Sequence, residues 1–455
     1  MIRALFRSAL VILALAPPLQ AETNIQEVVS PGGLKAWLVE DHGIPFTALQ
    51  IRFSGGTSLD RAGKRGAVNL MTALIEEGAG DLDSQGFAAA RDDLAARIGF
   101  ASDQDGLSVS ATFLTENRDQ GVALLHSALT HPRFDDDAVE RVRGQVLTGL
   151  RADEKDPGAI ASKLARARSY GDHPYATDGS GTIDSVTALT RADIVTAFAD
   201  AVARDRIHVA AAGDISPADL GALLDTLLGD LPATGAPQPV DASPVYTKAV
   251  MVEQFPGPQS VVVFGQKGMR FDDPDYFAAS LLNEILGGGR FSARLMTEVR
   301  EKRGLTYGIG TSLASFDHAQ SILGQFQASN ANVGQAIKVI REEWTKIAAE
   351  GVTEEELTNA KTYMTGAYPL RFDGNGTIAS ILVGMQIMGL SPDYPKTRNA
   401  RVEAVTMADI KRVAAALFTP DQLGFVVVGQ PEGVEFGKTS RICGSDGLDL
   451  LGMVA

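Results

Sequence analysis

The residues best suited to metal chemistry in this sequence are its histidines, and their spacing does not suit a metal site. The chain has six histidines and one cysteine, Cys443. A helix presents two imidazoles to one zinc ion only when they lie three or four residues apart, and no two histidines here do. The motifs H-E-x-x-H and H-x-x-E-H are both missing. We therefore expect no metal cofactor in this chain.

Three consecutive glycines, Gly287, Gly288 and Gly289, form the next candidate for chemistry. They are not followed by the Lys-Ser/Thr pair that ends a phosphate-binding loop. The preceding apolar segment, residues 276–286, has helical spacing, and glycine readily leaves the helical conformation. Residues 287–289 therefore predict a turn at the end of a helix.

The glycines are followed by a segment rich in arginine. Residues 290–308 read R-F-S-A-R-L-M-T-E-V-R-E-K-R-G-L-T-Y-G. Taken alone, Arg300 is typical of a cation in the last turn of a helix, where it complements the helix dipole before a cap at Gly304. Taken alone, Tyr307 is typical of a half-buried strand residue. When Arg300 and Tyr307 are considered one at a time, a purely structural role explains each of them.

The elements that must position these residues combine strands and helices. Apolar and polar residues alternate as in half-buried strands over three segments, residues 34–39, 47–53 and 107–113. Apolar residues recur at helical spacing over four segments, residues 67–77, 85–98, 119–129 and 136–151. Grouped strands with helices predict α+β domains, each with a largely antiparallel sheet and helices packed on one face.

Two sequence matches at the same offset of 216 residues indicate that the fold occurs twice. V-T-A-L-T-R-A-D-I, which ends at Ile194, aligns with V-E-A-V-T-M-A-D-I, which ends at Ile410, and residues 208–213 align with 424–429. In both copies a threonine three residues before an aspartate predicts a capped helix start. These pairs are Thr190 with Asp193 and Thr406 with Asp409.

The division of the chain follows from its proline content and its length. Four prolines in residues 232–247 predict a semi-rigid linker. It separates a first domain at 22–231 from a second at 248–437, and leaves a tail at 438–455. A chain of 455 residues is suited to two domains of about 200 residues. We therefore expect two homologous domains.

The first residues predict export. Residues 1–21 combine Arg3 and Arg7 with an apolar run at 9–16 and a small residue at Ala21, the pattern of a secretory signal peptide. The run is too short to cross a bilayer, so a permanent membrane anchor is the weaker alternative. We expect a periplasmic or secreted protein without stable membrane insertion. The net charge of −15 argues against nucleic acid as a partner.

The segment from Gly287 to Tyr307 carries a family resemblance. A glycine-rich loop followed by R-E-x-x-G-L-x-Y resembles the second-half signature of the pitrilysin/insulinase (inverzincin) peptidase family. The resemblance implies a pitrilysin/mitochondrial processing peptidase-like fold. It also implies that Arg300 and Tyr307 hold the substrate backbone and stabilise the charge on the attacked carbonyl, and that Gly287, Gly288 and Gly289 bind substrate.

The first half departs from that family at the zinc site. The D-x-x-G-x-x-G pattern that begins at Asp60 is present, but Asn69 and Ala73 stand where the two zinc-ligating histidines would be. Thr72 replaces the glutamate base, and residues 146–151, where the family has its third ligand, contain no glutamate. An amide, a methyl and a hydroxyl neither hold zinc nor activate water.

The resemblance and the departure together imply a non-catalytic subunit of a heterodimeric zinc peptidase. The partner would be a pitrilysin-family catalytic chain that holds the zinc, and Arg300 and Tyr307 would act on peptide substrates at its site. We expect no activity from this chain alone. The alternative is a catalytically dead periplasmic peptide-binding or scaffold protein, and an active hydrolase with an unrecognised site has the least support. Retention of Arg300 and Tyr307 favours the heterodimer.

Overall fold

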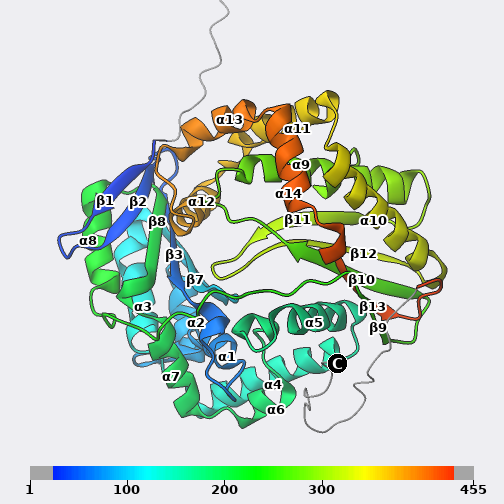
Figure 1. Cartoon of the computed structure of the whole chain (residues 1–455). Coiled ribbons are helices and arrows are strands. Elements are labelled where there is room, and N and C mark those ends of the chain that lie inside the picture. Colours follow the sequence, from blue (N-terminus) through cyan, green and yellow to red (C-terminus); the bar gives the residue numbers. More distant parts are fainter. Residues whose placement is uncertain (1–23, 435–455) are drawn as a thin grey trace, which may run out of the picture.

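The computed structural model describes residues 24–434. The predicted signal peptide and the predicted tail at 438–455 lie outside these residues. Two units, each a sheet covered by helices, face each other across the middle of the molecule (Figure 1). In the described part of the chain, no helix has the length and apolar character needed to cross a membrane.

The first unit is built around a six-stranded sheet with the order β1-β2-β8-β3-β7-β6. All neighbouring strands are antiparallel except β2 and β8. The strands are β1 (Gln26–Val29), β2 (Lys35–Glu40), β3 (Phe46–Ser54), β6 (Arg97–Ser102), β7 (Gly106–Leu114) and β8 (Ile207–Gly213). The helices are α1 (Ala67–Leu74), α2 (Ser84–Asp93), α3 (Arg118–Thr130), α4 (Asp136–Asp153), α6 (Ile183–Ala188), α7 (Arg191–Ala201) and α8 (Pro217–Leu228).

The second unit has a five-stranded sheet with the order β11-β12-β10-β13-β9. Its strands are β9 (Val250–Gln254), β10 (Gln259–Lys267), β11 (Ile309–Ser315), β12 (Gln320–Ser329) and β13 (Gly424–Gly429). Its helices are α9 (Tyr276–Gly287), α10 (Val333–Glu350), α11 (Glu354–Ala367), α13 (Tyr394–Ala404) and α14 (Met407–Leu417), with a π-helical turn at Met296–Glu301.

The two sheets have the same topology, which confirms the predicted duplication. Read from β6, the first sheet has the order β6-β7-β3-β8-β2, and β11-β12-β10-β13-β9 repeats it with one parallel pair at the same place. Strand β1 is an addition to the first sheet. The hydroxyls of Thr190 and Thr406 accept hydrogen bonds from the backbone N–H of Asp193 and Asp409, so both predicted capping boxes are present.

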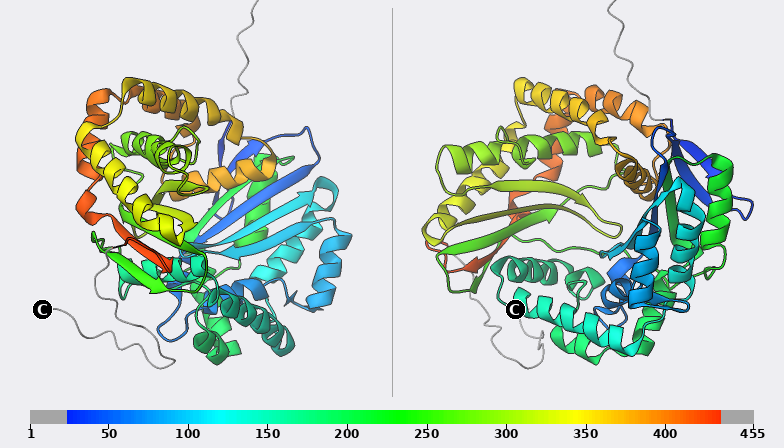
Figure 2. Two further views of the ribbon diagram at one scale, coloured as in Figure 1. Left: turned by 90° about the vertical axis from the view of Figure 1, so that its right-hand side faces the viewer. Right: turned by 180° about the vertical axis from the view of Figure 1, so that it is seen from behind.

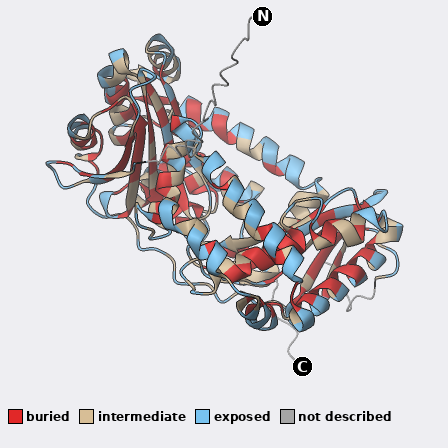
Figure 3. Cartoon of the chain, turned by 90° about the horizontal axis from the view of Figure 1, so that it is seen from above, coloured by how far each residue is buried: buried red, intermediate tan, exposed pale blue. Residues whose placement is uncertain are grey.

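Alternating burial explains how each sheet obtains its core. In β7 the buried residues Leu107, Val109 and Phe113 join the apolar cluster under the helices, whereas Ser108 and Ser110 lie on the opposite face. Side chains of successive strand residues point to opposite faces of a sheet, so one face becomes apolar. Figure 3 shows the buried residues on the strands and on the inner sides of the helices.

Two helices pack on the sheet of the opposite half. Helix α5 (Pro157–Tyr170) lies against β10 and β13, and helix α12 (Asn375–Ile387) lies against β2, β3 and β8. Both lie between the two sheets in Figures 1 and 2. The contact of α12 is apolar, because Leu382 and Val383 join Trp37 and Val39 in one buried cluster. The two halves therefore interlock, which the sequence analysis did not predict.

Two of the predicted helices end earlier than expected. The helix expected at 85–98 is α2, which ends at Asp93, and β6 begins at Arg97. Between them Ala95 has a φ of 49°, and Ile98 pairs with Ala111 in the sheet. The helix expected at 67–77 is α1, which ends at Leu74 before the short hairpin of β4 (Gly78–Ala79) and β5 (Leu82–Asp83). In both places a turn and strand pairing override the helical period.

Candidate functional site

The D-x-x-G-x-x-G segment that begins at Asp60 positions helix α1. Asp60 accepts hydrogen bonds from the backbone N–H groups of Gly66 at 2.7 Å and Val68 at 2.9 Å. Gly66 has a φ of 89°, and a Cβ there would lie 2.6 Å from the carbonyl oxygen of Ser180. Asp60 thus satisfies donors of the first turn that have no partner within the helix. The helix start of the motif is therefore present, although the zinc-ligating side chains are not.

The three altered positions lie on one side of α1, with Thr72 and Ala73 three and four residues after Asn69, but their side chains are not zinc ligands. Asn69 is half-buried and lines a cavity of about 460 Å³. The buried Thr72 donates its hydroxyl to the carbonyl of Val68 at 2.7 Å, and Ala73 is exposed. The hydroxyl of Thr72 is therefore engaged by its own helix.

The charged residues around Asn69 are paired with each other. Arg52 donates two hydrogen bonds of 2.7 Å to Asp103, and Arg166 donates one of 2.8 Å to Asp178. Burial opposes the ionisation of Asp103, but Arg52 more than offsets this and lowers the pKa of that carboxyl. Within residues 24–434 no three histidine, cysteine, aspartate or glutamate side chains are grouped to hold a metal. Carboxylates bound to guanidinium groups, without imidazole, do not fit zinc.

The predicted glycine loop follows α9 and lies against β11. Gly288 caps the helix, and Gly289 has a φ of 84°. A Cβ on Gly287 would lie 2.5 Å from the side-chain oxygen of Thr311, so only glycine permits this approach. Gly287, Gly288 and Gly289 all line the larger cavity described below.

Arg300 lies in the π-helical turn Met296–Glu301 rather than in a regular helix. Its guanidinium carbon is 4.7 Å from the ring centroid of Phe291. The carbonyl of Arg300 accepts a hydrogen bond of 2.8 Å from Gly304, which has a φ of 62°, as expected for a terminating glycine. In the described part of the chain, the Arg300 side chain makes no ion pair.

Tyr307 lies in a bend before β11, so the strand position considered for it is wrong. Its side chain is 90% exposed, and its hydroxyl has no hydrogen-bond partner within residues 24–434. The bend is held by Thr306, which donates to the carbonyl of Gln327 at 2.7 Å. A free hydroxyl thus stands on an anchored turn.

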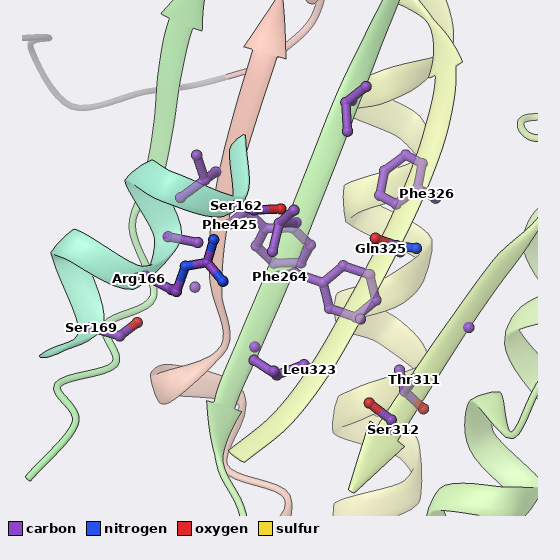
Figure 4. A pocket seen from close by; sticks show the side chains of 18 of the residues that line it. Ser162, Arg166, Ser169, Phe264, Thr311, Ser312, Leu323, Gln325, Phe326 and Phe425 are labelled. Atoms are coloured by element: carbon purple, nitrogen blue, oxygen red, sulfur yellow. The ribbon is translucent and has the colours of Figure 1, made fainter. Parts of the chain in front are cut away.

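A cavity of about 990 Å³ lies between α5 and the second sheet. Figure 4 shows Ser162 and Arg166 on α5 and, across the cavity, Leu323 and Gln325, which both belong to β12. Arg300 and Tyr307 do not line it. The structure therefore joins the glycine loop to a cavity and leaves the Arg-Tyr pair outside that cavity. Sequence reasoning missed the cavity because α5 and its sheet lie far apart in the chain.

The turn between β11 and β12 contacts the first half beside Asn69. The backbone N–H of His318 donates to the hydroxyl of the buried Tyr175 at 3.1 Å. That hydroxyl donates to Asp105, which also accepts a bond of 3.3 Å from Asp317 N–H. Burial raises the pKa of Asp105 despite these donors. A turn of the second half, through Phe316, therefore lines the same cavity as Asn69.

Known proteins resemble this chain over most of its length. Residues 188–364 match the family model described as Peptidase M16 inactive domain. A Helicobacter pylori protein described as a non-peptidase homolog YmxG is 24% identical over 90% of this chain and 95% of its own. A probable mitochondrial-processing peptidase subunit beta from Schizosaccharomyces pombe is 24% identical over 69% of this chain and 71% of its own.

Solved structures resemble the fold as a whole. A crystal structure of a peptidase M16 inactive domain from Pseudomonas fluorescens is 28% identical, with a TM-score of 0.84 over 91% of this chain and 100% of that one. A protease from Helicobacter pylori is 17% identical, with a TM-score of 0.80 over 89% of this chain and 99% of that one, and shows the shared fold. The predicted fold class is confirmed. The descriptions 'inactive domain' and 'non-peptidase homolog' agree with the absence of a zinc ligand set at Asn69, Thr72 and Ala73.

Proposed function

The chain belongs to the pitrilysin/insulinase (M16) peptidase family, and we propose that it is the non-catalytic subunit of a heterodimeric zinc peptidase. The observation that carries this proposal is the state of Tyr307. An exposed ring with a free hydroxyl stands on an anchored turn, and Arg300, seven residues earlier in the chain, makes no ion pair within residues 24–434. Such donors are suited to a substrate carbonyl supplied from outside this chain.

The chemistry of the proposed site depends on the negative charge that develops on the oxygen of the attacked peptide carbonyl. As a peptide carbonyl is attacked, its oxygen becomes an oxyanion, and the Tyr307 hydroxyl would donate a hydrogen bond to it. The Arg300 guanidinium would anchor the substrate backbone or the tyrosine turn. These donors need only be held in position, so they need not belong to the chain that holds the metal.

The partner follows from what this sequence lacks. A second copy of the chain would bring no H-x-x-E-H motif, so a homodimer would have no zinc site. We therefore propose a different pitrilysin-family chain with the intact motif, and peptides as substrates. The pattern predicted as a signal peptide supports the proposal that this assembly is periplasmic or secreted.

One observation favours the alternative, a catalytically dead peptide-binding or scaffold protein. The cavity between α5 and the second sheet includes Gly287, Gly288 and Gly289 but excludes Arg300 and Tyr307. A peptide held there would lie in contact with the glycine loop without any tyrosine donor. The two functions differ in one measurable respect, which is turnover by the assembled complex.

The test is reconstitution with a catalytic relative from the same organism that has an intact H-x-x-E-H motif. The mature chain alone should contain no stoichiometric zinc and cleave no peptide, because Asn69, Thr72 and Ala73 offer no ligand set. The mixture should form a complex on size-exclusion chromatography and cleave peptides faster than the relative alone. About one tightly bound zinc per isolated chain, or no gain on mixing, would contradict the proposal.

A further inference from the structure

The cavity between α5 and the second sheet has an excess of positive charge. Three charged residues line it, namely Asp156, Arg166 and Arg168, all in or next to α5. Asp156 caps the helix, because its side chain accepts a hydrogen bond of 2.8 Å from the backbone N–H of Ala159. The carboxylate is therefore already engaged. Of the two guanidinium groups, that of Arg166 is paired with Asp178, and that of Arg168 makes no ion pair within residues 24–434.

Arg166 has an unused donor. One terminal nitrogen donates to Asp178 at 2.8 Å, but Nε is buried and has no hydrogen-bond partner among the described residues. Nε is too deeply buried for a ligand in the cavity to reach, but the other terminal nitrogen makes no hydrogen bond within residues 24–434 and can donate to a ligand. Arg166 also lines the smaller cavity beside Asn69, so it stands where the two cavities adjoin.

Arg168 lacks a neutralising partner. Its guanidinium donates to the Thr247 hydroxyl at 2.7 Å, and no carboxylate lies within ion-pair distance in residues 24–434. Burial lowers the pKa of Arg168, which is the direction expected for a cation without a nearby anion. A half-buried guanidinium held only by a hydroxyl favours an anionic ligand, and carboxylate matches its geometry.

The remaining lining suits an extended chain. Val261 and Val263 alternate along β10 with core residues and line the cavity, and Leu323 and Gln325 do the same on β12. Ser312 adds a hydroxyl from β11. Aliphatic surface interrupted by a few amide and hydroxyl groups is typical of sites that hold a peptide by shape and a few hydrogen bonds.

We propose that this cavity binds acidic peptide segments, with Arg166 and Arg168 each holding a carboxylate of the ligand. Residues two apart on a helix do not face each other, so the two guanidinium groups engage different groups of the ligand. The proposal rests on the proposed function only in taking a peptide as the ligand. The chain has a net charge of −15, so general electrostatics would disfavour acidic peptides, and a preference for them must come from this site.

The test measures binding of short fluorescent peptides to the mature chain by anisotropy. One set compares a peptide with two acidic residues, the same peptide with glutamines, and the same peptide with lysines. A second set compares a free with an amidated C-terminus, which distinguishes side-chain from terminal carboxylates. We expect the acidic peptide to bind about tenfold more tightly than the glutamine peptide, as for the loss of a charged hydrogen bond.

Variants identify the site. Arg166→Gln and Arg168→Gln should each weaken binding of the acidic peptide about tenfold and leave the glutamine peptide unchanged. The control is Arg151→Gln, which removes an exposed arginine of α4. Arg168→Gln removes no ion pair within residues 24–434, so it is informative even if Arg166→Gln, which loses the bond to Asp178, folds poorly.

Equal binding of acidic and glutamine peptides together with no loss on amidation, or no effect of both arginine variants, would overturn the inference. Loss of binding on glutamine substitution supports the inference and identifies a side-chain carboxylate as the bound group. Loss of binding on amidation supports it and identifies the terminal carboxylate. Binding is measured without the catalytic partner, so it does not depend on turnover. If no active peptidase could be reconstituted, an arginine-dependent preference for acidic peptides would still support this inference. If that preference were absent, the proposed subunit role would be unaffected.

Discussion

Individual residues of the altered motif separate into those that fold α1 and those that would do chemistry. Asp60 and Gly66 keep the structural part, because both are needed to start the helix against residue 180. At Asn69 and Ala73 the side chains needed to bind zinc are missing. Arg300 and Tyr307 differ from Asp60 and Gly66, because their side chains contribute little to the core of the fold.

The role of Tyr307 can be tested by removing one oxygen atom. Tyr307→Phe should lower turnover of the reconstituted complex by about 10²–10³, as for the loss of one oxyanion donor. The side chain is 90% exposed and its hydroxyl has no partner in the described chain, so folding should not change. Complex formation is checked by size-exclusion chromatography, with Tyr363→Phe, a half-exposed tyrosine of α11, as the control. An intact complex with unchanged turnover would favour the scaffold function.

Asp60 should make stability depend on pH. Burial raises its pKa to about 6 in the folded chain, against 3.8 as the ordinary value, although three backbone N–H groups oppose the shift. Because the folded state holds the proton more tightly, this stabilisation is present below pH ~4 and is lost as pH rises through about 6. The shift corresponds to at most roughly 3 kcal/mol.

Asp60→Asn removes this titration. At pH 4 the variant should be less stable than the wild type, because the hydroxyl oxygen of the protonated Asp60 can still accept a hydrogen bond from the backbone, whereas the amide nitrogen of asparagine only donates. The difference in unfolding free energy should narrow between pH 4 and pH 7, and urea unfolding at several pH values measures it. A difference that widens with pH would show that the buried carboxylate is favoured in its ionised form.

Among the elements, the glycine loop at the end of α9 depends on one close contact. Gly287→Ala should destabilise the fold by about 1–3 kcal/mol, because the added methyl would lie 2.5 Å from the oxygen of Thr311. Gly144→Ala is the matched control, since nothing lies within 4 Å of a Cβ on that exposed position of α4. It should stabilise the helix by up to about 1 kcal/mol. Thermal unfolding of both variants is the measurement.

Elements with local signals were predictable, and those defined by distant contacts were not. The threonine caps of α7 and α14 and the alternation of β7 are written in adjacent residues. The sequence analysis predicted neither α5 nor α12, and local residue patterns do not show which sheet a helix covers, so their exchange between halves was missed. Arg300 and Tyr307 could be selected because a local sequence motif contains both. The cavity beside α5 could not be predicted, because it forms only when α5 packs on the sheet of the other half.

At the scale of the whole molecule, the exchange of α5 and α12 ties two similar units into one body. Each unit has its own apolar core under its outer helices. The third apolar cluster joins them, because α12 covers the inner face of the first sheet at Trp37 and Val39. Gln386 adds a hydrogen bond of 2.7 Å to the carbonyl of Val209. The halves should therefore stay together without a covalent link.

Cleavage of the predicted linker at 232–247 tests this. With a protease site inserted there, the cut chain should elute as one species under native conditions. Leu382→Ala, on the face of α12 in the joining cluster, should release the halves after cleavage, because emptying a fully buried leucine site costs about 2–5 kcal/mol. Leu282→Ala empties an equally buried site inside the second core, so it should lower stability without separating the halves. If the cut wild-type chain separated, the covalent linker rather than the exchanged helices would hold the molecule together.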